Sequence, residues 1–169
     1  MGAELNQVQN ELRELSRGIH PAILSEGGLG PALKALARRS AVPVELDVDA
    51  PERLPERVEV TAYYVVAEAL TNAAKHANAS LVRVELGTED GLVRLDIRDD
   101  GAGGADPTRG TGLVGLKDRV EATGGTLRVQ SHPGQGTSLL AELPLTDVPG
   151  RLRDSTVSSL PAGLSPGRP

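Results

Sequence analysis

The chain of 169 residues contains no cysteine, no phenylalanine and no tryptophan, and its only aromatic residues are Tyr63 and Tyr64. Without cysteine it can form neither a disulfide nor a thiolate metal site, and this absence leaves the cellular compartment open. So few aromatic side chains also exclude the stacking platforms with which single-strand nucleic-acid binders hold bases. The hydrophobic core must therefore be built from leucine, valine and alanine.

Long apolar runs and a surplus of positive charge are missing as well. No stretch approaches the roughly 18 apolar residues that span a bilayer, and the N-terminus does not have the pattern of a signal peptide. The formal net charge is −5, which argues against a nucleic-acid partner. We therefore expect a cytoplasmic domain without direct membrane contact, whether or not the full-length protein is membrane-anchored.

The hydrophobic periodicity and the turn residues predict an alternation of helices and strands. In chain order these are helices at 5–19 and from Pro31 to Arg39, a strand at 42–48, a helix at 56–78, strands at 81–86 and 92–97, a loop at 99–111, a helix at 113–123, and strands at 126–131 and 137–143. Pro43 predicts that the first strand lies near a sheet edge. This order fits an α/β two-layer sandwich, a mixed sheet with helices on one face. The buried face of the long helix is expected to include Val60, Tyr64, Ala67, Leu70 and Ala74.

Four polar residues of the long helix, Glu68, Asn72, Lys75 and His76, follow the helical repeat and so line one stripe. A solvated helix face is the ordinary explanation, but Asn72 is flanked by small apolar residues on a mostly buried helix. A carboxamide oxygen beside a carboxylate suits Mg²⁺. Glu68 could orient or deprotonate a water, and Lys75 could meet a phosphate. His76 remains open between a packed side chain and one that contacts a ligand.

A glycine-rich acidic turn, Asp99-Asp100-Gly101-Ala102-Gly103, ends an alternating strand. An aspartate there can accept a hydrogen bond from an exocyclic amine such as that of adenine. Gly101 and Gly103 would let the backbone pass close to a flat ring. The alternative is a plain acidic turn, because Asp-Gly is common in turns.

The segment from Gly110 to Gly115 matches the dinucleotide pattern GxGxxG, but it follows a long loop and has no acidic residue about 20 positions on. We therefore reject a Rossmann site, and no Walker sequence occurs. Glycines that open a helix still expose backbone amides to phosphate oxygens. His20, which precedes Pro21 at a helix exit, is expected to cap or pack rather than to accept phosphate.

The three segments Glu68–His76, Asp99–Gly103 and Gly110–Arg119 resemble the nucleotide-binding boxes of sensor histidine kinases, whose superfamily includes gyrase B, Hsp90 and MutL. The resemblance extends to Leu145 and is closest to the NarL- and DesK-like subfamily, which has a short nucleotide lid. It implies a Bergerat-type ATP-binding fold, ATP with Mg²⁺, and transfer of the γ-phosphate to a histidine. It also implies relay to a LuxR-type response regulator.

The resemblance carries roles over to individual residues. Asn72 would hold Mg²⁺, Glu68 would be catalytic and assist the attacking imidazole or a water, and Asp99 would bind the adenine amino group. The full set expected to bind the nucleotide is Asn72, Lys75, His76, Asp99, Gly101, Gly103, Gly110, Thr111, Gly112, Leu113 and Thr137.

The sequence departs from the family in lacking the charged helix that carries the accepting histidine. Residues 1–25 are therefore interpreted as the remnant of a second dimerisation helix and its exit, 26–145 as the ATP-binding catalytic domain, and 146–169 as a disordered tail. Such a chain would bind ATP without autophosphorylating and would be a monomer or weak dimer, although the full-length protein would be a homodimer. The alternatives are a non-catalytic nucleotide-responsive interaction module and a serine kinase of the anti-sigma type.

Overall fold

The computed structural model describes residues 21–106, 108 and 111–147. The expected helix at 5–19, His20, Gly110 and the tail from residue 148 lie outside the described residues. The helices are α2 (Ala22–Gly27), α3 (Leu29–Arg39), α4 (Glu56–Asn72), the π-helical turn η1 (Ala73–Ala77) and α5 (Thr111–Ala122). The strands are β1 (Val44–Asp49), β2 (Val82–Glu89), β3 (Leu92–Asp99), β4 (Thr126–Ser131) and β5 (Thr137–Pro144).

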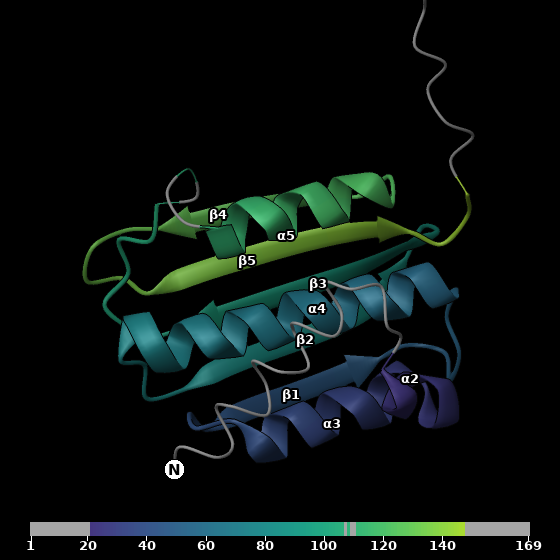
Figure 1. Cartoon of the computed structure of the whole chain (residues 1–169), viewed down its shortest axis with the longest axis horizontal. Helices are drawn as coiled ribbons and strands as arrows, with labels where there is room; N and C mark the ends of the chain where they lie inside the picture. The colour runs from purple at the N-terminus through teal and green to yellow at the C-terminus, as the bar shows by residue number, and fades with distance from the viewer. Residues whose placement is uncertain (1–20, 107, 109–110, 148–169) are drawn as a thin grey trace, which may run out of the picture.

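The five strands form one mixed sheet in the order β1-β2-β3-β5-β4. Only β1 and β2 are parallel, and α4 lies between them in the chain; the other neighbours are antiparallel. The helices cover one face of this sheet, with α3 beside β1 and α5 beside β4 (Figure 1). The predicted two-layer sandwich is confirmed. The prediction from Pro43 also holds, because β1 is an edge strand.

The hairpin between β2 and β3 is tighter than the sequence predicted. The segment from Gly87 to Gly91 reads as one long turn, yet the strands pair as far as Glu89 opposite Leu92. The turn therefore consists of Asp90 and Gly91 alone, both with positive φ (50° and 76°). Two positive φ angles in a two-residue loop are the geometry that matches the twist of a hairpin, and Asp-Gly is a favoured pair for it.

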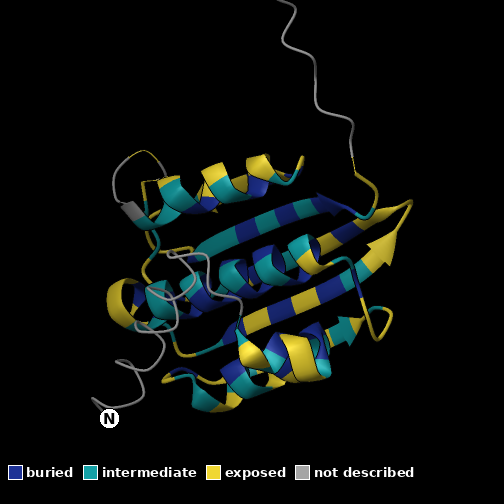
Figure 2. Ribbon diagram, turned by 45° about the vertical axis from the view of Figure 1, so that its right-hand side comes forward, coloured by how far each residue is buried: buried dark blue, intermediate teal, exposed yellow. Residues whose placement is uncertain are grey.

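The core lies between the sheet and the helices and is aliphatic apart from Tyr63, which is 1% exposed. Alternate residues of β3 are buried, as the sequence predicted, and Figure 2 shows the same alternation of buried and exposed bands along the strands. The face predicted for the long helix is only partly right. Ala67 and Leu70 are buried, whereas Val60, Tyr64 and Ala74 are half-buried. The buried surface of α4 is wider than the single stripe that the sequence predicted, because α4 packs against the sheet and has α3 and α5 on either side.

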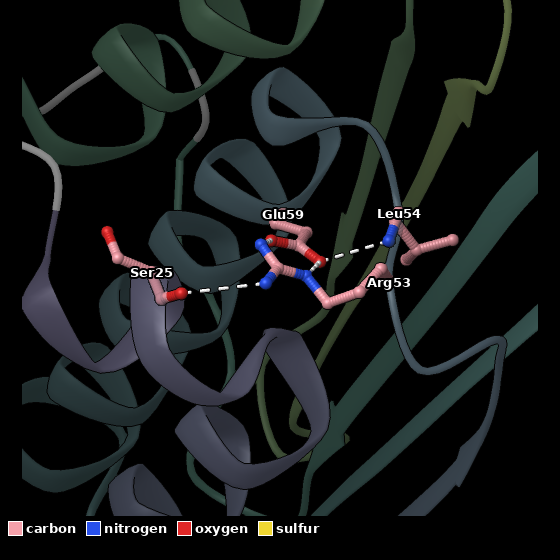
Figure 3. A network of polar contacts seen from close by, with 4 residues as sticks. All are labelled: Ser25, Arg53, Leu54 and Glu59. Carbon is pink, nitrogen blue, oxygen red and sulfur yellow. Dashed lines mark hydrogen bonds and ion pairs between the residues drawn. The ribbon is translucent and has the colours of Figure 1, made fainter.

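An ion pair with a buried carboxylate fixes the start of α4. The Glu59 side chain is 1% exposed, and its carboxylate accepts hydrogen bonds from Arg53 (Nε 3.3 Å, Nη2 3.4 Å) and from the Leu54 amide (3.0 Å). Arg53 also donates to the Ser25 carbonyl of α2 at 3.5 Å, as Figure 3 shows. The connector before α4 is thereby joined to the first helix that the structure describes.

The fold brings four separate segments to one end of the molecule. The end of η1, the end of β3, the start of α5 and the turn between β4 and β5 all lie at the left in Figure 1. These segments include the three motifs singled out in the sequence. Within the described residues, no helix is both long and apolar enough to cross a bilayer.

Candidate functional site

The polar stripe lies on the last turns of α4 and on η1. Glu68 and Asn72 are half-buried, whereas Lys75 and His76 are exposed. The helix changes at Ala73 from α to π geometry and ends at Asn78, which has a left-handed conformation (φ 47°). Such π turns are rare and occur frequently at functional sites. The exposure of His76 removes the possibility that it is a packed core histidine.

Burial raises the pKa of the Glu68 carboxyl, and the nearby Lys75 and His76 act in the opposite direction. Desolvation disfavours the charged form, and a carboxylate with a raised pKa is a stronger base. This setting suits the role of proton acceptor that the sequence analysis expected for Glu68, which stays a prediction.

Gly112, the second residue of α5, lies directly against this carboxylate. A Cβ added at Gly112 would overlap Glu68 Oε1 and lie 3.2 Å from its Cδ. Any larger residue would have to displace the Glu68 side chain. The close approach therefore joins the first and third sequence motifs, which are 44 positions apart in the chain when counted from Glu68 to Gly112.

Asp99, the last residue of β3, is held by backbone amides from two directions. Its Oδ1 accepts hydrogen bonds from Gly101 N at 2.9 Å and from Thr137 N at 3.3 Å. Thr137 is also its partner residue in β5. Within the described part of the chain, Oδ2 accepts no hydrogen bond, so one oxygen of a fixed carboxylate remains for a ligand.

The backbone after Asp99 passes between η1 and the β4–β5 turn. Ala102 N donates to Ala77 O at 2.7 Å, and Gly134 N donates to Ala102 O at 2.6 Å. Gly101 packs so closely on Ala77 that an added Cβ would overlap the Ala77 methyl and lie 2.5 Å from its carbonyl oxygen. Gly103 lies against the carbonyl of His132. The glycines of this motif are therefore required by neighbouring backbone.

The other wall of this region comes from β4 and β5. The hydroxyls of Ser131 and Thr137 lie 2.8 Å apart, and the Ser131 hydroxyl also accepts a hydrogen bond from Ala105 N at 2.9 Å. Ser131 thus links the loop after Gly103 to the strand that carries Thr137. This hydroxyl pair completes the surroundings of Asp99.

The structure thus gathers the sequence candidates into two groups. Asp99, Gly101, Gly103 and Thr137 lie together around the end of β3, and Glu68 meets Gly112 at the start of α5. Thr111 opens α5 and Leu113 is half-buried, whereas Gly110 lies outside the described residues.

The sequence analysis missed two residues that organise the first group, Asp100 and Ser131. Asp100 accepts hydrogen bonds from Ser80 and Leu81, which are about 20 positions away in the chain. The doubled acid at 99–100 was visible in the sequence, and its second member could have been examined as a capping group. Ser131 stands at the start of a segment that shares the family resemblance, but no role was expected of its hydroxyl.

A family model and the sequences of known proteins both relate the chain to the same family. A family model described as "Histidine kinase-, DNA gyrase B-, and HSP90-like ATPase" matches residues 57–147. The chain is 37% identical over 154 residues to the sensor histidine kinase NarS of Mycobacterium tuberculosis, covering 85% of this chain and 36% of that protein. It is 30% identical over 152 residues to the oxygen sensor histidine kinase NreB of Staphylococcus carnosus, covering 85% of this chain and 44% of that protein.

A solved structure agrees with these relatives. The histidine kinase domain of a blue-light activated histidine kinase from Erythrobacter litoralis superposes with a TM-score of 0.57 at 25% identity, covering 70% of this chain and 59% of that one. The chain spans less than half the length of the two curated relatives.

Proposed function

Because the chain belongs to the histidine kinase-, DNA gyrase B- and HSP90-like ATPase family, we propose that it is the ATP-binding catalytic domain of a two-component sensor histidine kinase. Its ATP would donate the γ-phosphate to a histidine on a dimerisation domain of the full-length protein. A LuxR-type response regulator would then receive the phosphoryl group. The similarity to NarS and NreB supports this reading.

The observation that carries the proposal is the fixed carboxylate of Asp99. Two amides hold Oδ1, and Oδ2 is left to accept a hydrogen bond from the 6-amino group of adenine. Gly101 and Gly103 support the same assignment, because they let the backbone beside this carboxylate lie close against Ala77 and the His132 carbonyl. Thr137 lies beside Asp99 and would contact the same ring.

The phosphates would lie toward the start of α5. Backbone amides at a helix N-terminus attract phosphate oxygens, and Gly112 brings this terminus against Glu68. Lys75 and His76 are exposed at the end of η1, where a positive charge could meet the phosphates. Thr111 and Leu113 flank Gly112, and Gly110 would border the same phosphates from the preceding loop.

The donor set fits a magnesium ion that comes with the nucleotide. The described residues contain no cluster of three His, Asp or Glu side chains able to hold a metal ion. A single carboxamide oxygen from Asn72, one turn after Glu68, suits Mg²⁺, which keeps waters and phosphate oxygens in its shell. When bound, the ion would neutralise charge on the phosphates. Glu68, whose pKa is raised by burial, would accept the proton of the attacking imidazole or position that group.

Nucleotide binding is tested by thermal unfolding with Mg-ATP. A ligand at a hundredfold excess over its dissociation constant stabilises a protein by about 2.7 kcal/mol. We expect this stabilisation for the unchanged chain and its loss in Asp99→Asn, because the Asn carboxamide would turn its NH₂ group toward the adenine amine. Asp47→Asn, at an exposed position on β1, is the control with the same change of charge. An equal shift in Asp99→Asn and the unchanged chain would contradict the adenine site.

Phosphoryl transfer needs the missing acceptor, so the second test supplies a dimerisation domain in trans. Labelling of its histidine from γ-labelled ATP is expected with the unchanged chain and not with Glu68→Gln, while ATP binding by the variant persists. If neither chain transfers phosphate although both bind ATP, the domain is a nucleotide-responsive interaction module. Labelling of a serine in a target protein would identify the anti-sigma type of kinase instead.

A further inference from the structure

Asp100 is exposed, yet its carboxylate accepts three hydrogen bonds from Ser80 and Leu81. Its Oδ1 accepts hydrogen bonds from Ser80 N at 2.8 Å and Leu81 N at 3.0 Å, and its Oδ2 accepts one from the Ser80 hydroxyl. These bonds lower the pKa of the Asp100 carboxyl, the Ser80 hydroxyl most and the two amides next. The side chain therefore makes a specific structural connection.

This connection joins the end of β3 to the segment that leads from η1 into β2. Asp100 N also donates to Leu81 O at 3.3 Å. Next along the chain, Gly101 packs on Ala77 and Ala102 N donates to Ala77 O. Residues 100–102 are thus fixed to η1 and to the segment after it.

Asp100 is also the central residue of the turn that orients Asp99. The hydrogen bond from Gly101 N to Asp99 Oδ1 closes an Asx turn, and Asp100 is the residue that this turn encloses. A change in the φ and ψ angles of Asp100 would move Gly101 N and release Oδ1 on that side. The tether to Ser80 and Leu81 opposes such a change.

We propose that Asp100 is a positioning residue for purine recognition, which holds the Asp99 carboxylate in the orientation that distinguishes a 6-amino purine from a 6-oxo purine. The inference rests on the proposed function, because it assumes that Asp99 binds the adenine amino group. Asp100 itself need not touch the nucleotide. Its loss therefore affects the choice between purines more than the binding of the ribose and phosphates.

The experiment compares the dissociation constants of Mg-ATP and Mg-ITP by titration calorimetry. Inosine carries an oxygen where adenine carries the amino group, and the two ligands share the ribose and triphosphate. For Asp100→Ala we expect ATP to bind about fivefold more weakly, which corresponds to one hydrogen bond of about 1 kcal/mol, and ITP to be unaffected. Asp47→Ala on β1 is the control, since it removes the same charge from an exposed position.

Asp100→Asn separates position from charge. Its carboxamide oxygen can still accept the two amides of Ser80 and Leu81, so we expect the ATP-to-ITP preference of the unchanged chain to be retained within about twofold. Should Asp100→Asn lose the preference as fully as Asp100→Ala, charge rather than position would be responsible and the proposal would be wrong. If Asp100→Ala does not fold, Asp100→Ser takes its place, because the shorter serine hydroxyl can accept at most part of the hydrogen bonds from Ser80 and Leu81. If Asp100→Ser keeps the full preference for ATP over ITP, the proposal is likewise wrong.

Asp99→Asn distinguishes failure of the inference from failure of the proposed function. If Asp99→Asn loses the preference for ATP while Asp100→Ala keeps it, the adenine site stands and the positioning role of Asp100 is refuted. If Asp99→Asn keeps the preference, the adenine site itself is wrong, and the inference falls with it.

Discussion

The Arg53–Glu59 ion pair, in which only the glutamate is buried, should respond asymmetrically to removal of its two members. Arg53 is 56% exposed in its side chain, whereas Glu59 is 1% exposed. In Arg53→Ala the buried Glu59 carboxylate loses both guanidinium hydrogen bonds and keeps the one from the Leu54 amide. In Glu59→Gln the guanidinium regains water, and the Leu54 amide still finds a carboxamide oxygen. Although Arg53 is the more exposed member, its removal should cost more stability, because it leaves the buried Glu59 carboxylate without the guanidinium.

The magnitude follows from the geometry of the bonds. Hydrogen bonds to charged groups contribute about 1.5–3 kcal/mol each, but the two made by Arg53 are long at 3.3 and 3.4 Å. We therefore expect Arg53→Ala to lower the free energy of unfolding by about 2–3 kcal/mol, below the range of about 3–5 kcal/mol for a fully buried ion pair because the Arg53 side chain is 56% exposed. Glu59→Gln should cost about 1 kcal/mol, the value of a typical neutral hydrogen bond.

Urea unfolding followed by far-UV circular dichroism measures both values. The matched control is Arg83→Ala, which breaks the exposed Arg83–Glu45 pair and should cost no more than about 0.5 kcal/mol. Two results would refute the reasoning: a cost for Arg53→Ala no larger than that of the control, or a larger cost for Glu59→Gln than for Arg53→Ala.

Three further predictions concern Glu68, Gly101 and the contact between Arg119 of α5 and Tyr64 of α4. The pKa of Glu68 is higher in the folded than in the unfolded chain, so the ionised carboxylate lowers the stability of the fold. Glu68→Gln should therefore raise the melting temperature at pH 7.5. This gain should vanish below about pH 4, where the carboxyl is protonated in both states. Gly101→Ala should cost about 1–3 kcal/mol in urea unfolding because its methyl overlaps Ala77, whereas Gly115→Ala, with open space around it in α5, should be neutral or stabilising. The Arg119 guanidinium lies 4.2 Å from the ring centroid of Tyr64, so Arg119→Ala should cost about 1 kcal/mol and Arg119→Lys less; equal costs would exclude a cation–π contribution.

Local patterns predicted most of the sheet. The alternation in β3 depends on neighbours two positions apart, and such a pattern is visible in the chain itself. The turn before β3 was predicted too long, because the pairing of Gly87 and Glu89 with β3 is formed only in the folded sheet. The six-residue helix α2 was not predicted, because it is too short to show a helical period and lies between Pro21 and Gly28. The wide buried surface of α4 also escaped prediction, since it depends on the helices at either side.

The candidate site shows the same division. Asp99 and Glu68 stood out because their residue types and spacing suggest chemistry. Asp100 and Ser131 did not, because their roles come from hydrogen bonds to segments that only the folded chain brings close. Sequence therefore pointed to the residues proposed to meet the nucleotide, and the structure was needed to find those that hold them in place.

Glu68 and Gly112 are placed in a way that does not favour the stability of the folded chain. A half-buried carboxylate disfavours its own ionised form, and the helix start that faces it has no side chain to pack there. For stability alone, a neutral residue at 68 would serve better and the backbone at 112 would not need to approach so closely. The proposed pairing of a base at Glu68 with phosphate-binding amides at the start of α5 would require both features together. The cost of the ionised Glu68 would then belong to the proposed catalytic site, and the pH dependence of the stability of Glu68→Gln measures that cost.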